Sequence, residues 1–364
     1  MRWLGIALVI PLGLYRPHRC GRRSLSKECG GSRLRVFLAR HTRSLRLLNN
    51  NQSSSNMAIP TILDTDIGHD VDDVWALAFL LRCPELEVKL ITTSTGDTVY
   101  RAKLVAKMLQ LMGRTDIPIG IGIPLDDNPH THDTWLGDFD LGQYPGLVLQ
   151  DGVGAICDTI MQAKDPVSLI CIGPVPNIAA ALARQPAICE NAKFVGMHGS
   201  IHRGYLDAPK PMREFNVKVH ALACRAVFEA PWEKVITPLD TCGNIVLEDE
   251  RFARIRQAAE QQGPASPAAI CLDNHLGWYE QVKDWPILQH RDPDTQSSIL
   301  YDLVAVYLAF AEDLLDMQSL PIQVTPDGKT LINDDDGASV RCALNWHDKN
   351  AFLDLVTERL VSAV

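Results

Sequence analysis

The sequence lacks the cysteine spacing that marks a zinc site or a disulfide framework. Its ten cysteines are scattered over 364 residues without a C-x-x-C pair, and most lie in apolar runs such as residues 169–172. Such cysteines are typical of reduced, buried thiols, so we expect a cytoplasmic protein. Hydrophobic residues make up 46% and charged residues 22% of the chain, as in ordinary globular proteins with a sizeable core. A small disulfide-stapled scaffold is therefore excluded.

Acidic residues are almost missing from the first 56 positions. This segment has ten Arg and one Lys against the single acid Glu28, a local charge of +10, which leaves −19 for residues 57–364 of a chain whose net charge is −9. A body of that sign repels phosphate backbones, and the basic segment has no interleaved aromatic residues for base stacking. We therefore expect no nucleic acid as the main partner.

The sequence also lacks a hydrophobic run that could span a membrane. Residues 4–14 form an apolar run of eleven residues, which is too short to cross a bilayer but suits a signal peptide. The Arg- and Ser-rich stretch after it suits a mitochondrial transit peptide, and residues 49–56 form a polar linker. We expect residues 1–56 to be an N-terminal extension, with a secretory or mitochondrial role or no structural role, and residues 57–364 to form one domain.

Within residues 57–364, β-rich runs alternate with helical patterns. Several of the runs are apolar throughout, as in strands that are covered on both faces. The pattern predicts strands at 59–63, 88–94, 117–123, 167–172, 193–197 and 234–237, with helices at 74–81, 98–112 and 177–184. The fold class is α/β, with an open, mostly parallel Rossmann-like sheet and helices on both of its faces.

Two connections in this pattern are long enough to be lids or structured insertions. They cover residues 125–147 and 273–298, and both contain aromatic residues. They also hold four histidines, each of which could donate a proton to a ligand or be a solvated bystander: His130, His132, His275 and His290.

The most informative stretch is residues 63–73, LDTDIGHDVDD, which holds five aspartates. Carboxylates crowded at the end of a strand repel one another unless a cation compensates them. Apart from the nitrogen of His69, the ligands offered are oxygens, which favours Ca²⁺ or Mg²⁺ over Zn²⁺. Caps for the next helix are the alternative for Asp70, Asp72 and Asp73, but not for Asp64 and Asp66, which belong to the strand.

Here the sequence resembles the inosine-uridine nucleoside hydrolase family. The family signature is a strand ending in Asp-x-Asp-x-Gly, followed by an Asp-Asp pair that opens a helix, as in residues 64–68 and 72–73. Further landmarks in the same order are Ile91-Thr92-Thr93 before Gly96-Asp97, residues 173–177 (GPVPN), Met197, residues 214–217 (EFNV) and Tyr301-Asp302. The resemblance implies a nucleoside hydrolase-like fold, a homodimer or homotetramer, and a role in nucleoside catabolism or purine salvage.

The resemblance also implies a role for individual residues. Ca²⁺ would be bound by Asp66, Asp73, Asp302 and the backbone carbonyl of Pro176, with Asp72 as the base on a metal-bound water. Asp64 would orient the other acids, and the role of Asp70 stays open. The residues expected to contact the substrate are Asp97, Met197, Tyr205, Glu214 and Asn216, with Tyr301 as the catalytic residue near the leaving base.

Three positions depart from the best-known form of the family. Asp97 replaces an Asn, and the loop 199–209 offers Tyr205 or Asp207 where the family often has another Asn. Tyr301 stands where purine-active members have His, and a neutral phenol is a weak general acid near pH 7. The expected reaction is hydrolysis of the N-glycosidic bond of purine or pyrimidine ribonucleosides, with the preferred base left open.

Two other functions compete with this hypothesis. One is a non-catalytic, Ca²⁺-dependent ribose- or nucleoside-binding protein, in which the three departures have abolished turnover. The other is a haloacid dehalogenase-like phosphatase with Asp64 as nucleophile, although the downstream acidic run that it needs, residues 334–336, is typical of a surface turn.

Overall fold

The computed structural model describes residues 58–125, 127–288 and 291–363. The predicted extension 1–56 and His290 lie outside the described residues. Within the described residues, one ten-stranded sheet forms the centre of the fold, in the order β4-β3-β2-β1-β5-β6-β7-β10-β8-β9. Its strands are β1 (Ile59–Thr65), β2 (Leu86–Thr93), β3 (Ile119–Ile121), β4 (Val148–Leu149), β5 (Val167–Cys171), β6 (Ala192–Met197), β7 (Lys234–Thr237), β8 (Leu315–Val324), β9 (Thr330–Ile332) and β10 (Ala338–Trp346).

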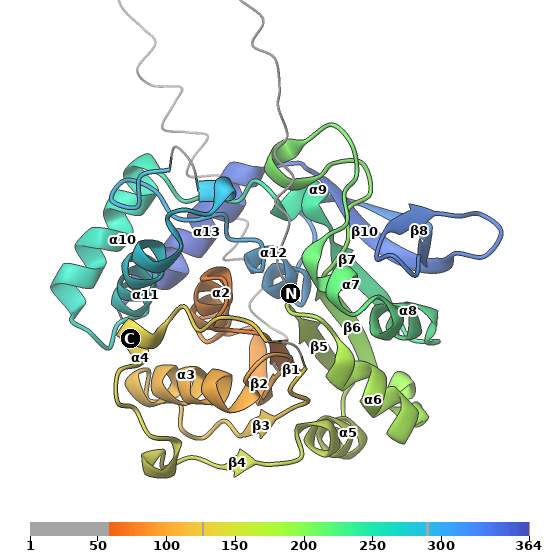
Figure 1. Cartoon of the computed structure of the whole chain (residues 1–364), viewed down its shortest axis with the longest axis horizontal. Helices are drawn as coiled ribbons and strands as arrows, with labels where there is room; N and C mark the ends of the chain where they lie inside the picture. Colours follow the sequence, from red (N-terminus) through yellow and green to blue (C-terminus); the bar gives the residue numbers. More distant parts are fainter. Residues whose placement is uncertain (1–57, 126, 289–290, 364) are drawn as a thin grey trace, which may run out of the picture. The chain divides into compact units, whose positions relative to one another are not determined.

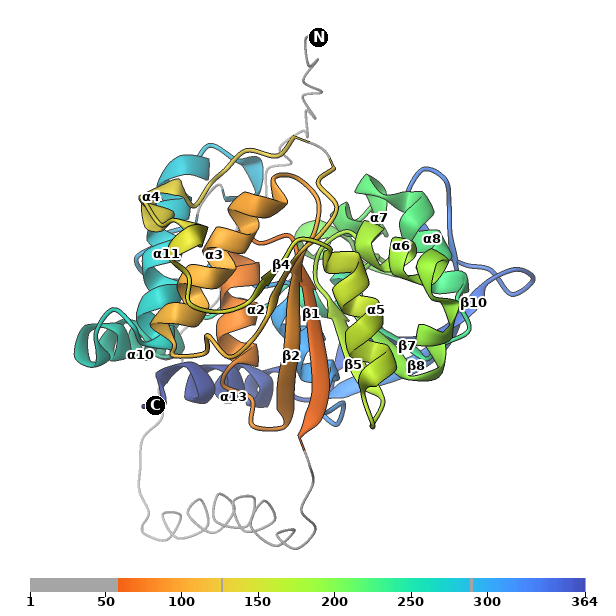
Figure 2. The ribbon, with the colours of Figure 1, turned by 90° about the horizontal axis from the view of Figure 1, so that it is seen from below.

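Helices lie on both faces of the sheet (Figures 1 and 2). They are α2 (Asp72–Leu80), α3 (Thr98–Leu111), α4 (Asp133–Leu136), α5 (Gly152–Gln162), α6 (Pro176–Arg184), α7 (Phe215–Val219), α8 (Ala221–Glu229), α9 (Leu239–Cys242), α10 (Asp249–Gln262), α11 (Pro267–Val282), α12 (Leu303–Leu308) and α13 (Lys349–Val361). None of the described helices is long and apolar enough to cross a membrane.

Consecutive residues of the central strands point into two separate cores. Leu63 of β1 and Ile170 of β5 belong to the core under α2, α3 and α12, whereas Ile62 and Leu169 belong to the core under α5, α6 and α8. This alternation follows from the period of two along a strand. Strands buried on both faces therefore read as continuous apolar runs, and the predicted α/β class is confirmed.

The strand order reverses between β1 and β5. From β1 the chain moves outward through β2 and β3 to β4, and then returns to the other side of β1 to build β5, β6 and β7, all in parallel. In an open α/β sheet, the carboxyl ends of strands at such a reversal bound a crevice in which ligands bind. The acidic run that follows β1 lies at this position.

Two parts of the sequence-based prediction were incomplete or wrong. The strands β4, β8, β9 and β10 were not predicted, and β8 pairs antiparallel with both β10 and β9. The connection 273–298, predicted to be a lid or a structured insertion, is helical over residues 273–282, which belong to α11. Ser266 caps that helix by accepting a hydrogen bond from the Ala269 N–H, and His275 and Trp278 lie buried on it at helical spacing.

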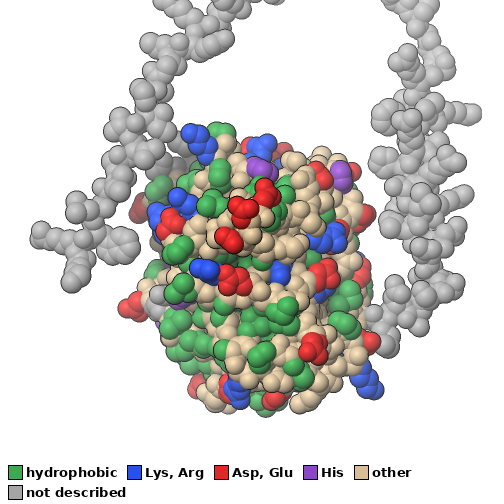
Figure 3. Space-filling view, turned by 90° about the vertical axis from the view of Figure 1, so that its right-hand side faces the viewer, with side chains coloured by type: hydrophobic (Ala, Val, Ile, Leu, Met, Phe, Trp, Pro, Cys, Tyr) green, Lys and Arg blue, Asp and Glu red, His purple; other side chains and the backbone are tan. Residues whose placement is uncertain are grey.

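Figure 3 shows the face of the molecule at the β8 and α8 end of the sheet. Apolar side chains gather in the lower part of this view, and acidic and basic side chains alternate over the rest. Among the described residues, the most exposed large apolar side chain is that of Leu222 on α8, at 73%, and Leu331 and Ile332 of the edge strand β9 are 41% and 45% exposed. This end of the sheet therefore carries both charge signs beside exposed apolar side chains.

Candidate active site

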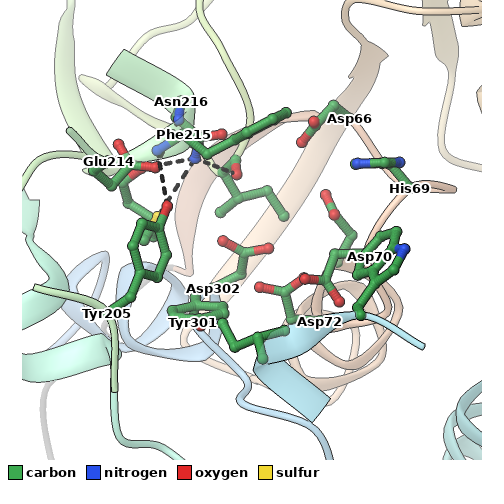
Figure 4. A pocket seen from close by; sticks show the side chains of 15 residues that line it. Asp66, His69, Asp70, Asp72, Tyr205, Glu214, Phe215, Asn216, Tyr301 and Asp302 are labelled. Atoms are coloured by element: carbon green, nitrogen blue, oxygen red, sulfur yellow. Dashed lines mark hydrogen bonds between the residues drawn. The ribbon is translucent and has the colours of Figure 1, made fainter. Parts of the chain in front are cut away.

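A cavity of about 210 Å³ opens at the strand-order reversal, beside the carboxyl end of β1. Its floor is acidic, and aromatic rings stand around it (Figure 4). It is lined by Asp66, His69, Asp70, Asp72, Asp73, Ile172, Met197, Tyr205, Glu214, Phe215, Asn216, Trp285, Ile287, Tyr301 and Asp302. Most of the residues that the sequence singled out are thus brought together from segments more than 200 positions apart.

Three buried carboxylates form the centre of the floor. Asp72, Asp73 and Asp302 each offer one oxygen, and these oxygens all lie within 4.8 Å of one another. Asp72 and Asp73 stand in the first turn of α2, whose cap residue makes no side-chain capping bond. Asp302 occupies the cap position of α12, and its side chain makes no capping hydrogen bond either. Helix capping therefore does not account for these acids.

Burial and mutual repulsion raise the pKa of all three groups well above the usual aspartate range. Burial is the largest cause for each of them, and repulsion from neighbouring carboxylates comes next. Asp70 and Asp73 raise the pKa of Asp72, and Asp66 raises that of Asp73. The pKa of Asp302 is raised by Asp72 and Asp73. A cation would relieve both the desolvation and the repulsion. Three oxygens this close together fit a hard divalent ion such as Ca²⁺.

Asp66 lines the cavity but lies outside this group of three. It stands above Asp302 and Asp72 in the view of Figure 4. The segment after β5 approaches it closely, since a Cβ on Gly173 would lie 2.4 Å from its Oδ1. Asp72, rather than Asp66, is therefore the acid whose carboxylate oxygen lies next to those of Asp73 and Asp302.

Asp64 lies beneath the cavity and does not line it. Its Oδ1 accepts hydrogen bonds from the Thr92 hydroxyl, at 2.5 Å, and from Asn177 Nδ2, at 2.8 Å. Burial raises the pKa of Asp64 to about 7 despite these two bonds. Asn177 also donates to the Thr93 carbonyl and accepts from the Ile123 N–H. Asp64 thus ties β1 to β2 and to the start of α6.

Pro176 is buried at the first position of α6, next to Asn177. It is not among the residues that line the cavity. Asp70 does line the cavity, and its Oδ1 accepts a hydrogen bond from the Val71 N–H. Burial raises the pKa of Asp70 to about 6.

A buried arginine near the acids was missed by the sequence reasoning. Arg101 is 2% exposed, and it donates to the backbone carbonyls of Thr95 and Ile67. Its charge lowers the pKa of Asp66 and opposes the effect of burial there. The only signal in the sequence was a cation inside the apolar pattern of the predicted helix 98–112. Arg101 thus supplies part of the charge compensation from the protein itself.

The turn between β1 and α2 depends on Gly68. This residue has φ of +109°, and a Cβ there would lie 2.7 Å from side-chain atoms of both Leu104 and Tyr100. Glycine adopts such a conformation without a steric penalty. The turn brings Asp66, at the end of the strand, into the same cavity as Asp72 and Asp73, which open the helix.

Glu214 and Asn216 lie in the wall of the cavity, at the start of a short helix. Asn216 belongs to the short helix α7, and Glu214 caps that helix. The Glu214 carboxylate accepts hydrogen bonds from the N–H groups of Gly199, Asn216 and Val217. Asn216 Nδ2 donates to the carbonyls of Ile172 and Met197, at 3.0 Å each. The capping bonds turn the chain here, so the two side chains converge through a helix turn.

Two tyrosines form one side of the cavity. The Tyr205 hydroxyl accepts a hydrogen bond from the Phe215 N–H at 2.9 Å, and its ring meets that of Tyr301 edge to face at 6.0 Å. The Tyr301 hydroxyl is buried and has no hydrogen-bond partner among the described residues. Burial raises the pKa of Tyr301 well above its usual range, so this phenol stays neutral.

Several expected contact residues lie away from the cavity. Asp97 caps α3 by accepting from the N–H groups of Val99 and Tyr100, and its side chain is 49% exposed. Asp207, the alternative to Tyr205, is exposed and pairs with Arg203 at 2.6 Å. The described lid histidines, His130, His132 and His275, are not among the lining residues.

The structure adds an aromatic and apolar wall that the sequence reasoning did not identify. The His69 ring lies 5.9 Å from that of Phe215 and 5.3 Å from that of Trp285. Ile172 and Ile287 complete this wall. The sequence contained one usable signal, since Phe215 stands between the two residues of the Glu-x-Asn motif.

Without a bound cation, we expect the protein to lose stability as pH rises from about 4 to 7. The pKa of Asp64 is raised from 3.8 to about 7, and that of Glu214 from 4.5 to about 7, in both cases chiefly by burial. Between these values the folded state binds more protons than the unfolded state, so the free energy of unfolding falls with rising pH. Thermal unfolding in chelator between pH 4.5 and 8 measures this slope.

If the cluster of Asp72, Asp73 and Asp302 binds Ca²⁺, the same series should become flatter, because a cation would bind the deprotonated carboxylates and stabilise the folded state at high pH. Binding at 100 times Kd adds about 2.7 kcal/mol to the free energy of unfolding. This account of the buried acids would be contradicted if the free energy of unfolding rose with pH in chelator, or if it did not change on addition of Ca²⁺ at pH 8.

The chain matches the family model described as inosine-uridine preferring nucleoside hydrolase over residues 61–354. It is 33% identical over 210 residues to the non-specific ribonucleoside hydrolase RihC of Klebsiella pneumoniae (strain 342), a match that covers 55% of this chain and 67% of the relative. It is 34% identical over 213 residues to the pyrimidine-specific ribonucleoside hydrolase RihA of Escherichia coli O127:H6, a match that also covers 55% of this chain and 67% of the relative.

Solved structures show the same fold. A purine-preferring ribonucleoside hydrolase from Gardnerella vaginalis superposes with a TM-score of 0.67 at 23% identity, covering 83% of this chain and 98% of that one. The plant nucleoside hydrolase PpNRh1 gives a TM-score of 0.67 at 19% identity, covering 84% of this chain and all of the other.

Proposed function

The chain belongs to the inosine-uridine preferring nucleoside hydrolase family, and we propose that it hydrolyses the N-glycosidic bond of ribonucleosides in the acidic cavity with the help of bound Ca²⁺. The observation that carries this proposal is the group of three buried carboxylates, Asp72, Asp73 and Asp302, at the floor of a cavity walled by aromatic rings. The reaction passes through an oxocarbenium-like sugar, so it needs a base for water, support for the ribose and help for the leaving base.

Asp73 and Asp302 would hold the ion, with Asp66 and the Pro176 carbonyl as the further ligands that the family resemblance implies. A bound Ca²⁺ would lower the pKa of a water molecule and fix the ribose hydroxyls. Asp72 also belongs to the group of three, and it would take the proton from the attacking water, the role that the family resemblance implies for it. Asp64 would hold the end of β1 through its bonds to Thr92 and Asn177.

The ribose would lie over the acids, with Met197, Glu214 and Asn216 beside it. Since the Glu214 carboxylate and the Asn216 amide nitrogen are occupied by backbone groups, their further contacts would come from the second carboxylate lone pairs and the Asn216 oxygen. The free Tyr301 hydroxyl and Tyr205 would face the base. Asp97 would contact the substrate only after a movement of the loop before α3.

The relatives differ in the base that their names report. One is called pyrimidine-specific, one non-specific and one purine-preferring, so the preferred base of this chain is left to experiment. We also propose that the protein acts in nucleoside catabolism or purine salvage as a cytoplasmic homodimer or homotetramer.

The test is ribose release by the full chain from inosine, guanosine, adenosine, uridine and cytidine. We expect at least one nucleoside to yield free ribose and free base in equal amounts. Binding of a nucleoside without release of sugar would support a binding protein instead, and phosphate release from phosphomonoesters without cleavage of nucleosides would support a phosphatase.

A further inference from the structure

A second cavity, of about 730 Å³, adjoins the active site. Ile287 lines both cavities, so at this point a single side chain forms the wall of each. Leu206 of the second cavity directly follows Tyr205 of the active site in the sequence, and Pro286 follows Trp285 in the same way. The second cavity therefore lies beyond the aromatic side of the active site, where the proposed function places the nucleobase.

The charge of the second cavity is opposite to that of the active site. Arg251, Arg291 and Lys349 line it and are partly buried. Glu248 is the one acid among its described lining residues, and this residue is exposed. Arg251 is neutralised by Asp354, whose carboxylate lies 2.7 Å away outside the cavity. The charge available to a ligand therefore comes from Arg291 and Lys349.

These two cations are bonded only to neutral groups among the described residues. Arg291 Nη1 donates to Gln296 Oε1 at 3.3 Å, and Lys349 Nζ donates to the Asn244 backbone carbonyl at 3.5 Å. The side-chain oxygen of Asn244 is buried and has no hydrogen-bond partner within the described part of the chain. The Tyr279 hydroxyl donates to the Arg291 carbonyl at 2.8 Å, which holds the chain in place there. Cationic donors placed in this way are suited to a carboxylate.

We propose that the second cavity binds an acidic arm on the nucleobase, so that the enzyme prefers ribonucleosides whose base carries a carboxylate; this inference rests on the proposed function. With the ribose over the acids and the base beside Tyr205 and Tyr301, a substituent on the outer edge of the base points past Ile287 into the second cavity. Arg291 and Lys349 bind the carboxylate there through charge-assisted hydrogen bonds. Their charge also offsets the repulsion between an anionic substrate and the acids of the active-site floor.

The test uses pairs of nucleosides whose arms differ in charge. 5-Carboxymethyluridine is compared with its methyl ester, and N⁶-succinyladenosine with its dimethyl ester, so that a pyrimidine and a purine are both covered. We expect the full chain to cleave the acid of at least one pair with a kcat/KM about tenfold above that of the ester, the effect of two partly exposed ion pairs. High ionic strength should reduce this preference, because salt screens such pairs.

The double variant Arg291→Gln, Lys349→Gln should abolish the preference for the acid and leave kcat/KM for the esters and for unmodified nucleosides nearly unchanged. Lys89→Gln with Arg225→Gln is the matched control. It removes the same charge at two exposed positions, on β2 and α8, outside both cavities. The control should keep the preference of the wild type.

Several results would overturn the proposal. The wild type could cleave acid and ester equally, or cleave unmodified nucleosides but neither acid. The preference could survive in the double variant, or disappear in the control, which would assign it to the net charge of the protein. Inorganic phosphate tests for a separate anion: if it changes cleavage of an unmodified nucleoside in the wild type but not in the double variant, the second cavity binds a free anion instead of a base arm.

Failure of the proposed function gives a different result. A wild-type chain that cleaves no nucleoside, modified or unmodified, overturns the hydrolase mechanism and this inference together. The comparisons above are read in a wild-type chain that is active on an unmodified nucleoside, so they overturn the role of the second cavity alone.

Discussion

We expect Asp72→Asn to lower kcat for nucleoside hydrolysis by about 10²–10⁴-fold, the contribution of a positioned general base. The amide keeps the shape of the side chain but cannot take a proton from water. Because Asp72 lies within 4.8 Å of Asp73 and Asp302, the substitution also relieves repulsion in the cluster. We therefore expect the variant to fold and to bind Ca²⁺ within about tenfold of the wild-type affinity. Steady-state ribose release and Ca²⁺ titration calorimetry measure the two effects.

Asp70→Asn is the matched control for Asp72→Asn. Asp70 lines the same cavity and is also an acid, but it lies outside the group of three carboxylates. It should lower kcat by less than about tenfold. Equal losses in the two variants would mean that the negative charge of the cavity, rather than proton transfer to Asp72, controls the rate. A loss of Ca²⁺ binding in Asp72→Asn would make Asp72 a ligand instead of the base.

We expect Asp302→Asn to abolish activity at micromolar Ca²⁺, and millimolar Ca²⁺ to restore part of it. Asp302 is 2% exposed and makes no capping bond on α12, so its charge serves the cluster rather than the helix. Loss of an outer-shell partner of a metal typically weakens binding 10–100-fold, and loss of a ligand should cost at least the upper end of that range. The measurement is the Ca²⁺ dependence of ribose release, after chelation and readdition of the ion.

Chelation of the wild-type protein is the companion experiment. It should remove activity, and Ca²⁺ should restore it fully. Asp316→Asn serves as the control, since Asp316 is a carboxylate on β8, away from the cavity. Activity that survives exhaustive chelation, or an Asp302→Asn variant with the Ca²⁺ affinity of the wild type, would argue against a metal at this floor.

The six predicted strands appear as β1, β2, β3, β5, β6 and β7, because strands buried on both faces leave continuous apolar runs in a sequence. The strands β8 and β10 were missed because each has one partly exposed face, and their burial patterns are mixed. α11 was missed because its aromatic residues suggested a lid. Pattern alone does not distinguish a buried helix from an ordered loop of similar composition.

The candidate site was predictable where its residues form a local motif, as in residues 64–73. The aromatic wall of the cavity was not predictable from the sequence. His69, Trp285 and Ile287 follow no spacing rule, and they meet only because α11 and the segment after it fold back over the β1–α2 turn. Arg101 was not predictable either, because its role depends on the distance between α3 and the acids of β1.

The sequence by itself determined the α/β class, the acidic centre and the family resemblance, because these depend on local periodicity and on motifs of a few residues. The tertiary structure decided which acids meet. It brought Asp302 to Asp72 and Asp73 across more than 220 positions, left Asp97 as a helix cap outside the cavity, and turned Glu214 and Asn216 into a capped helix turn. The physical reason is that electrostatic repulsion and hydrogen bonding depend on distances in space, and chain order alone does not specify those distances.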